Sequence, residues 1–542
     1  GGIYTAVTVQ HRAPNWQATQ PTAPTTVSAA PNPTTPTRSG TRAPAPAPHA
    51  EAPAIPPPAE TGKRAGAGGS RFRMLQRAKT PAASATAGSD DEPEPAPPST
   101  PTPVAAPAAG DEPALYLGID IGTSGCCAVV IDRNGRLVHQ AQAPIPVPIA
   151  HDGQVTQDPH VWWKSLTVCL QQLGKLVDLA QVRAIAVDAT SGTLLLCDAQ
   201  GTPLAPALMY NDTRAQAEAA TIAEIAERHS GAHGASSALA KLLWLHNKGL
   251  DKKAAHCLHQ ADWVVGKLCG LWGVSDYHNA LKLGYDAEGL RWPAWLKKFP
   301  LNTELLPRVQ APAAPVATVT SEVAAAFGFR PDTQVLSGTT DGVAAFLAAG
   351  ALHPGQAVTS LGSTLVLKLM SDKPVFSPEH GVYSHRLGSR WLVGGASNTG
   401  GAALLQYFKL EQIKDMTALL DPDKPTGLEY YPLAGVGERF PIYDLEMTAV
   451  LEPLPGDSVT FFQGMLEGIA RVEAQGYRLL AKLGAPTVKE VFTTGGGSEN
   501  PAWQRIRQRL LGVEMRKPRS RLAAYGTALL AAGLGEREIK VA

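Results

Sequence analysis

The chain has 542 residues, which is enough for two or more domains of ordinary size. Its 48 Lys and Arg residues nearly balance its 47 Asp and Glu residues, and without a basic stripe or an acidic tail a nucleic acid is not an expected partner. Because no apolar run reaches the roughly 18 residues of a membrane span, a membrane is not an expected partner either, and a small ligand is favoured.

Residues 1–113 differ in composition from the rest of the chain. They are crowded with Pro, Ala, Thr and Ser, and they cannot bury enough apolar surface to offset the entropy of ordering, so we expect disorder. The first stretch has few acidic residues and carries Arg12, Arg38 and Arg42, as organellar transit peptides do. A targeting leader and a plain extension of a cytoplasmic protein are both consistent with this composition.

The ordered part is predicted to begin with strands. Leu115–Ile121 and 126–131 are apolar runs joined by a Gly/Thr/Ser turn, and the hairpin dipeptide Asn134-Gly135 leads to a third strand over 136–143. These strands should form an antiparallel meander. Cys126 and Cys127 would point to opposite faces of the second strand, so we expect neither a mutual disulfide nor a shared metal, but reduced thiols of an intracellular protein.

Strands and helices alternate along the rest of the chain. Further strands are predicted at 182–187, 193–197, 335–336, 357–360, 365–370 and 489–493, and helices at 159–176, 344–349, 461–480 and 501–511. Long helical patterns are expected up to about residue 330. Because strand, small-residue turn and strand recur after residue 334, we predict a duplicated α/β architecture with a cleft between a lobe of 114–334 and a lobe of 335–542.

The first chemical motif is Gly118-Ile-Asp-Ile-Gly-Thr-Ser-Gly125. Asp120 ends a buried strand, and the glycine-flanked turn offers N–H groups and hydroxyls to phosphate oxygens. A buried carboxylate is costly alone, so Asp120 should have a charge partner such as Mg²⁺. Thr359-Ser-Leu-Gly-Ser-Thr364 repeats this chemistry in the second half. Each turn is also consistent with an ordinary hairpin that a hydroxyl caps.

Two further motifs lie at junctions between a strand and a helix. In Gly495-Gly-Gly-Ser-Glu-Asn500 the glycines would let a flat ligand rest against the backbone, with Asn500 on a base edge and Trp503 over its face; the alternative is a capping Asn and a core Trp. In Gly338-Thr-Thr-Asp-Gly342, Asp341 is either a helix cap or a catalytic carboxylate. The absence of G-x-G-x-x-G and Walker motifs disfavours a Rossmann or P-loop site.

Taken in chain order, the four motifs resemble those of the FGGY carbohydrate kinases. The resemblance covers about 115–535. It implies a sugar and ATP as ligands, Mg²⁺ as a cofactor, and the duplicated actin-like and hexokinase-like ATPase fold with two RNase H-like lobes. Sugar and phosphates are then expected on the first lobe, and ATP and the catalytic base on the second. Glycerol is disfavoured, because the Arg-Glu dipeptide of glycerol kinases has no counterpart after Trp163.

Longer segments resemble one branch of that family, the D-ribulose kinases of cyanobacteria and plants, also labelled xylulose kinase-like. These segments are 188–198, 275–285, 381–385, 394–398, 430–433 and 437–441. The branch implies conversion of D-ribulose to D-ribulose 5-phosphate and, together with the leader, a chloroplast location. D-xylulose or another ketose is the alternative substrate, and a catalytically silent ATP-binding regulator is the alternative outside enzymes.

The resemblance also implies roles for individual residues. Asp341 falls on the general base, Asp120 on a carboxylate near the reacting hydroxyl and the metal, directly or through water, and Ser191 on a sugar contact. The nucleotide and its phosphates are assigned to Gly122, Thr123, Ser124, Gly362, Ser363, Gly496, Gly497, Asn500 and Trp503. The segment 209–214 matches the family pattern only in part, so Asp212 and Arg214 receive no role.

Overall fold

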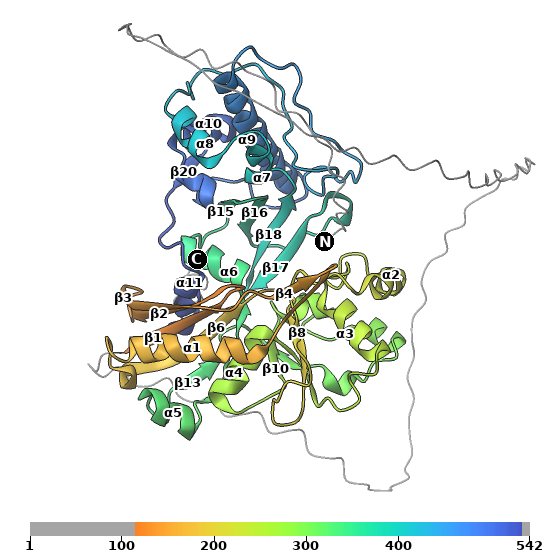
Figure 1. The fold of residues 1–542 in the computed structure, drawn as a ribbon, viewed down its shortest axis with the longest axis vertical. Coiled ribbons are helices and arrows are strands. Elements are labelled where there is room, and N and C mark those ends of the chain that lie inside the picture. Colours follow the sequence, from red (N-terminus) through yellow and green to blue (C-terminus); the bar gives the residue numbers. More distant parts are fainter. Residues whose placement is uncertain (1–113, 534–542) are drawn as a thin grey trace, which may run out of the picture. The chain divides into compact units, whose positions relative to one another are not determined.

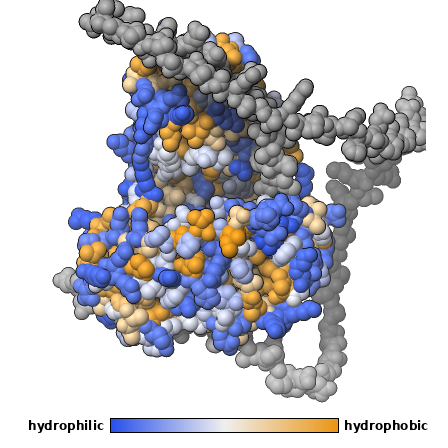
Figure 2. All heavy atoms as spheres, viewed as in Figure 1, coloured by the Kyte–Doolittle hydropathy of each residue, from blue (hydrophilic) through white to orange (hydrophobic). Residues whose placement is uncertain are grey.

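The computed structural model describes residues 114–533 of the chain, and every structural statement below concerns these residues. The prediction that 1–113 form a disordered or targeting leader falls outside the described residues and stays a prediction. Inside them, none of the helices is both long and apolar enough to cross a membrane. On the face shown in Figure 2, hydrophobic residues (orange) are interspersed among hydrophilic ones (blue), as on most folded domains.

The first large sheet grows from the predicted meander. In spatial order its strands are β12 (Pro315–Thr318), β13 (Gln334–Leu336), β6 (Val182–Ala189), β1 (Leu115–Ile121), β2 (Gly125–Asp132) and β3 (Leu137–Pro144), with β14 (Thr339–Thr340) also beside β6. Strands β1, β2 and β3 pair antiparallel, as predicted, whereas β6 joins β1 and β13 joins β6 in parallel. Parallel pairing thus brings together segments that are far apart in the sequence.

Helices cover both faces of this sheet, which explains why β1 and β6 are nearly continuous apolar runs. Helices α1 (Pro159–Leu173) and α4 (Gln260–Cys269) pack on one face, and α11 (Ala523–Ala531) packs on the other. The start of α1 is confirmed: the Asp158 side chain accepts a hydrogen bond from the backbone N–H of His160, and a proline opens the helix.

The second large sheet repeats the pairing pattern of the first. In spatial order its strands are β17 (Tyr383–Leu387), β18 (Arg390–Ser397), β16 (Leu365–Ser371), β15 (Gln356–Leu361), β19 (Glu490–Thr494) and β20 (Glu514–Arg516). Strands β15, β16 and β18 form an antiparallel meander, and β19 and β20 follow in parallel, as β6 and β13 do after β1. The predicted duplicated α/β fold is therefore confirmed. What the two halves repeat is the order and direction of their paired strands.

Two helices that were expected from the sequence support the second sheet. Helix α9 (Ser458–Lys482) places its apolar stripe in the core of this half, together with α10 (Pro501–Leu511). Gly512 ends α10 in a left-handed conformation with φ of +67°, which a glycine adopts without steric cost.

The two repeats meet through helix α6 (Asp341–Ala349), which follows β14, and helix α11, which follows β20. Figure 1 shows both helices near the level where the two sheets meet. Their backbones approach closely because Gly526 has no side chain: a Cβ atom built there would lie 1.9 Å from the Ala344 carbonyl oxygen. Helix α11 is thereby held between α6 and the first sheet.

Two expectations differ from the structure. The sequence places the strand at 335–336 in the second lobe, yet β13 and β14 pair with β6 of the first sheet. The sequence also predicts long helices up to about residue 330, where the structure has short ones connected by turns and by a small sheet. The helices and strands of this part are α2 (Gln216–Ile225), α3 (Ala238–Asn247), α4, α5 (Ser321–Phe327), β4 (Ile149–His151), β5 (Gln154–Gln157), β7 (Leu194–Cys197), β8 (Ala207–Leu208) and β9 (His256–His259).

Glycines end two of these helices earlier than the sequence pattern predicts. Gly270, with φ of +74°, ends α4 after ten residues, and Gly328, with φ of +82°, ends α5 after seven. The two remaining strands of the region, β10 (Val274–Asp276) and β11 (Arg308–Gln310), form a separate parallel pair.

Close contact between β1 and α11 makes Gly118 a sensitive position. A Cβ atom at Gly118 would lie 2.1 Å from the Ala524 carbonyl oxygen and 2.3 Å from the Ala528 amide nitrogen, both of which are backbone atoms. We predict that Gly118→Ala lowers the free energy of unfolding by about 2 kcal/mol or more, measured by urea denaturation. Gly456→Ala is the control, because nothing lies within 4 Å of its added Cβ. Equal stability of the two variants would contradict this packing.

Candidate active site

Three carboxylates converge at one edge of the first sheet. Asp120 of β1 lies directly opposite Asp188 of the parallel strand β6, and Thr339 of β14 lies opposite Asp188 on the other side. Asp341 follows two residues later as the first residue of α6. Because β1, β6 and β14 run parallel, their carboxyl ends share one edge, where α/β sheets commonly bind ligands.

Asp188 is the buried member of this group, and the sequence did not single out its side chain as a site residue. Its side chain is 0% exposed, and the Thr527 hydroxyl of α11 donates a hydrogen bond to Oδ2. Burial first, and then the neighbouring Asp120 charge, raise the pKa of Asp188 well above its usual range. Its Oδ1 has no hydrogen-bond partner among the described residues, so no donor there favours the ionised form.

Asp120, on the adjacent strand, is partly buried. Burial raises the pKa of Asp120 to about 6, the hydrogen bond with Asp188 lowers it, and the charge of Asp341 raises it again. At neutral pH this pKa leaves Asp120 mostly ionised, whereas the raised pKa of Asp188 favours the protonated form of that side chain. This residual negative charge is the feature that a bound cation would balance.

Asp341 begins helix α6 and is not its N-cap. Thr340 occupies the cap position without a side-chain hydrogen bond, and Oδ1 of Asp341 accepts one from the Gly342 backbone N–H at 2.6 Å. Burial raises the pKa of Asp341, while Lys368, the Gly342 N–H and Lys282 lower it. A carboxylate whose pKa is raised by burial, at the first residue of a helix, is a candidate general base.

Lysine side chains surround this edge, and the sequence reading missed all of them. Lys282 Nζ donates to the Ser191 carbonyl oxygen at 3.0 Å, and Lys368 Nζ donates to the Gly342 carbonyl oxygen at 2.7 Å. Lys241 is fully buried and donates to the carbonyl oxygen of Gly192 at 2.7 Å. One signal was available: a lysine within the apolar run Leu365–Ser371 is unusual unless its charge has a partner.

The turn that carries Ser191 follows β6 directly, and the side chain of Gln260 holds it in place. Gln260 Oε1 accepts hydrogen bonds from the Thr190 backbone N–H at 3.2 Å and from the Thr190 hydroxyl at 2.6 Å. That hydroxyl also lies 2.6 Å from the Thr193 hydroxyl. Ser191 itself is partly buried. It follows β6, the strand that carries Asp188, and its carbonyl oxygen accepts the hydrogen bond from Lys282.

The first hydroxyl turn connects β1 to β2 immediately after Asp120. The Gly122 N–H donates to the Gly125 carbonyl oxygen at 2.9 Å, and the Thr123 carbonyl oxygen accepts from the Gln157 amide at 3.2 Å. Gly122 and Thr123 are partly buried, and Ser124 is exposed. The turn is thus a tight hairpin, held in place beside the carboxylates.

The second hydroxyl turn and the glycine-rich loop lie together at the end of β15. The N–H groups of Gly401 and Ala402, at the start of α7 (Gly401–Leu405), donate to the carbonyl oxygens of Gly362 and Ser363. A Cβ atom at Gly495 would lie 2.6 Å from the Leu361 carbonyl oxygen, next to Gly362. Only a glycine allows this approach, and it places Gly496 and Gly497 beside the turn.

Asn500 and Trp503 have the structural roles that the sequence allowed as the alternative to nucleotide binding, a helix cap and a core residue. Asn500 caps α10, since its Oδ1 accepts from the Trp503 N–H at 3.0 Å, and its amide donates to the Thr417 hydroxyl at 3.0 Å. Trp503 is 3% exposed, and its indole N–H donates to the Leu466 carbonyl oxygen at 3.1 Å. Both side chains therefore have structural roles in this half of the fold.

Magnesium is the cofactor that the family resemblance implies. Among residues 114–533, no group of three or more His, Cys, Asp or Glu side chains is placed to hold a metal ion by itself. Mg²⁺ is usually bound by one or two carboxylates together with waters and substrate phosphates. Asp120, ionised beside Asp341 and next to the first hydroxyl turn, fits this mode of binding.

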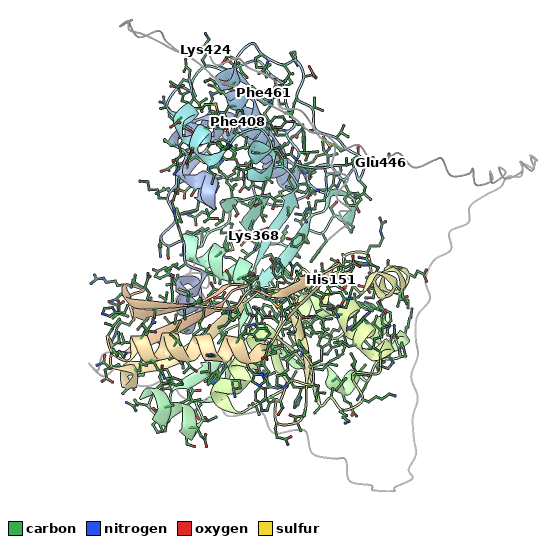
Figure 3. The ribbon with its side chains drawn as sticks, viewed as in Figure 1. His151, Lys368, Phe408, Lys424, Glu446 and Phe461 are labelled. Atoms are coloured by element: carbon green, nitrogen blue, oxygen red, sulfur yellow. The ribbon has the colours of Figure 1, made fainter. Side chains whose placement is uncertain are left out.

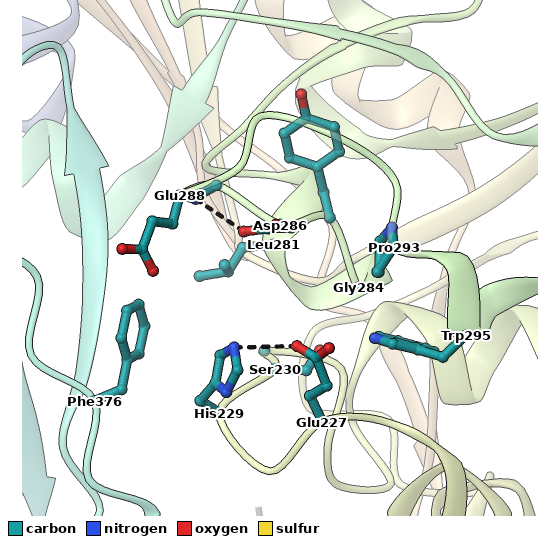
Figure 4. A pocket seen from close by; sticks show the side chains of 13 residues that line it. Glu227, His229, Ser230, Leu281, Gly284, Asp286, Glu288, Pro293, Trp295 and Phe376 are labelled. Atoms are coloured by element: carbon teal, nitrogen blue, oxygen red, sulfur yellow. Dashed lines mark hydrogen bonds and ion pairs between the residues drawn. The ribbon is translucent and has the colours of Figure 1, made fainter. Parts of the chain in front are cut away.

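A separate small pocket, shown in Figure 4, lies between the 227–231 turn, the 281–295 segment and Phe376. Its wall includes Trp295, an ion pair of 3.2 Å between Glu227 and His229, and Asp286, whose Oδ1 accepts from the Glu288 N–H at 3.1 Å. None of the predicted site residues lines it. The carboxylate edge of the first sheet is therefore the candidate active site.

The chain is similar to known carbohydrate kinases. Residues 115–348 match the N-terminal domain, and 357–533 the C-terminal domain, of the FGGY family of carbohydrate kinases. A xylulose kinase of Streptomyces coelicolor is 28% identical over 448 residues, covering 78% of this chain and 88% of that protein. A gluconokinase of Bacillus subtilis is 23% identical over 443 residues, covering 74% of this chain and 84% of that protein.

A solved structure has the same fold. The crystal structure of a xyloylose kinase from Brucella ovis aligns with a TM-score of 0.71 at 25% identity, covering 78% of this chain and 90% of that one. The fold class expected from the sequence, a duplicated actin-like ATPase fold, is confirmed by such neighbours.

The buried acid pair generates a prediction about stability. Because the pKa of Asp188 is raised in the folded state, the folded chain binds this proton more tightly than the unfolded chain, and folding loses stability as the pH rises above the ordinary pKa of 3.8. Asp188→Asn removes this titration. We predict that the variant gains at least about 1 kcal/mol over the native chain between pH 5 and pH 7, measured by urea unfolding at both values.

The matched control is Asp415→Asn on α8 (Leu410–Thr417), because Asp415 is exposed. Its stability should follow the native chain at both pH values. If the stability of Asp188→Asn also runs parallel to that of the native chain, the pKa of Asp188 is not raised in the folded state.

Proposed function

The chain belongs to the FGGY family of carbohydrate kinases, and we propose that within it the protein transfers the γ-phosphate of ATP to a free ketopentose, D-ribulose first. The observation that carries the proposal is the position of Asp341. It starts α6 at the carboxyl edge of the first sheet, beside Asp120 and under the influence of Lys282 and Lys368. A carboxylate in this environment can accept a proton from a sugar hydroxyl.

In the proposed reaction Asp341 accepts a hydrogen bond from the attacking hydroxyl and takes its proton as the new O–P bond forms. Phosphoryl transfer depends on alignment and on charge neutralisation more than on covalent help from the protein. The helix that carries Asp341 is packed against α11 and linked to Lys368, so the carboxylate is held on a rigid element.

The two hydroxyl turns are proposed to hold the phosphates. The turn at Gly122, Thr123 and Ser124 offers the N–H and hydroxyl groups of Thr123 and Ser124 next to Asp120. The turn at Gly362 and Ser363 offers those of Ser363 from the second sheet, while the Gly122 and Gly362 N–H groups close the two turns. Mg²⁺, when bound, supplies charge neutralisation between the phosphates, and Asp120 would hold it directly or through water. Gly496 and Gly497 lie beside the second turn, where the adenosine would rest against the backbone.

The identity of the sugar rests on different support. Segments 188–198 and 275–285 resemble the D-ribulose kinases, and these segments contribute Asp188, Ser191 and Lys282 to the candidate site. The names of relatives point to D-xylulose, the alternative, and to gluconate. Ser191 and Asp120 are the proposed sugar contacts, together with Asp341.

The choice of sugar can be tested with a panel. ADP release is measured with the purified chain, ATP and Mg²⁺ in the presence of D-ribulose, D-xylulose, ribitol, glycerol or gluconate. We predict the highest kcat/KM for D-ribulose and the lowest for glycerol. A higher value for D-xylulose would replace D-ribulose as the substrate, and no ADP above the sugar-free rate with any of the five would favour the silent regulator.

The role of Asp341 is tested separately. We predict that Asp341→Ala lowers kcat for the best sugar by about 10²–10⁴-fold, because the proton of the hydroxyl then has no acceptor. ATP affinity, measured by calorimetry, should stay near the native value, since Asp341 is assigned to the hydroxyl and not to the nucleotide. The exposed Asp415→Asn variant should keep native turnover. Near-normal turnover of Asp341→Ala would exclude it as the base.

A further inference from the structure

Lys368 is a charged residue in the middle of an apolar strand. It lies in β16 between the buried residues Leu367 and Leu369, and its side chain leaves the second sheet toward α6. Figure 3 marks Lys368 near the level where the two sheets meet. Its ammonium group donates to the Gly342 carbonyl oxygen at 2.7 Å, one residue after Asp341.

The position of Gly342 is adapted to this contact. A Cβ atom built at Gly342 would lie 2.7 Å from Lys368 Nζ, so a larger residue would have to displace the ammonium. Burial lowers the pKa of Lys368 to about 8, and the charge of Asp341 opposes that shift. A cation is therefore kept near the Asp341 carboxylate at neutral pH.

The other ionisable groups around Asp341 explain why this cation matters. Asp120 and Asp188 lie on the adjacent strands, and the negative charge of Asp341 raises the pKa of both. Lys282, from the first half of the chain, contributes a second positive charge at the Ser191 turn.

Two histidines in the same surroundings supply no charge. Burial lowers the pKa of His278 to about 4, and burial together with Lys368 lowers the pKa of His385 well below its usual range. His278 Nδ1 lies 2.8 Å from the Thr339 hydroxyl, and the rings of His278 and His385 are 6.5 Å apart. Lys368 and Lys282 are thus the cations that offset the acidic edge.

We propose that Lys368 is a positioning residue of the kinase reaction, which reaches from β16 to the start of α6 and holds the Asp341 carboxylate ionised and in place. The inference rests on the proposed function of Asp341 as the base. During transfer the proton of the sugar hydroxyl moves to Asp341, the O–Pγ bond forms and the bond from Pγ to the ADP oxygen breaks, while Lys368 keeps its own proton. Lys368 also ties the base to the strand that follows the second hydroxyl turn.

The test is the pH dependence of kcat/KM for Lys368→Met and Lys368→Gln. Both variants remove the positive charge, and the glutamine can still donate to the Gly342 carbonyl oxygen. Because Asp341 must be ionised to accept a proton, we expect the acidic limb of the profile to move up by about one pH unit or more in both, with activity recovered at higher pH. Lys368→Arg should keep the limb near its native position.

Two further variants calibrate the result. Lys282→Met should shift the acidic limb by less than Lys368→Met, because its effect on Asp341 is the weaker one. Lys373→Met should leave the profile unchanged, since Lys373 is exposed beyond the end of β16. An equal loss at every pH in Lys368→Gln, without a shift of the limb, would mean a purely structural lysine and would overturn the proposal.

A measurement without turnover separates this proposal from the proposed function. The Asp341 carboxyl is titrated by infrared difference spectroscopy. In one series the spectrum of Asp341→Asn is subtracted from that of the native chain. In the other, the spectrum of the double variant with Lys368→Gln and Asp341→Asn is subtracted from that of Lys368→Gln. A higher pKa in the Lys368→Gln background is expected whether or not any sugar is phosphorylated. An unchanged pKa overturns the role of Lys368, whereas a shifted pKa in a chain that phosphorylates no sugar overturns only the proposed function.

Discussion

Parallel pairing of β1 with β6 places two carboxylates, Asp120 and Asp188, opposite each other at the end of a buried sheet, and Asp341 follows on the next element. The rest of the site is arranged around this concentration of acidic groups. Burial and the neighbouring Asp120 charge favour the protonated form of Asp188, against the hydrogen bond from the Thr527 hydroxyl, and lysines from both halves of the chain approach the remaining charge. The negative charge that remains at this edge suits a cofactor that binds as a cation together with phosphates.

Duplication of the fold explains how these groups come together. Each repeat ends in a helix, α6 after the first sheet and α11 after the second, and the two helices pack against one another. One helix contributes Asp341 and the other contributes Thr527 to the same cluster of acids. Small residues make this possible, because Gly526 and Gly118 let α11 approach both α6 and β1 at backbone distance.

The second sheet completes the site from the other side. Its first hairpin offers Gly362 and Ser363, and the glycine-rich loop after β19 packs beside that turn through Gly495. Strand β16 leaves the same turn and carries Lys368 to α6. The proposed phosphate turn and the proposed base are thus connected by one short stretch of strand, as suits an enzyme that must align a phosphate with a hydroxyl.

The sequence by itself determined the elements and the candidate base. Apolar runs and the Asn134-Gly135 dipeptide define the meander, and the hydroxyl turns and Asp341 lie at strand ends because local composition fixes turns and helix starts. Only the tertiary structure decided that β13 and β14 join the first sheet, that Asp188 faces Asp120, that Lys368 reaches α6, and that Trp503 belongs to the core. These contacts join segments far apart in the chain, and a local pattern carries no record of which strand or charge will lie opposite.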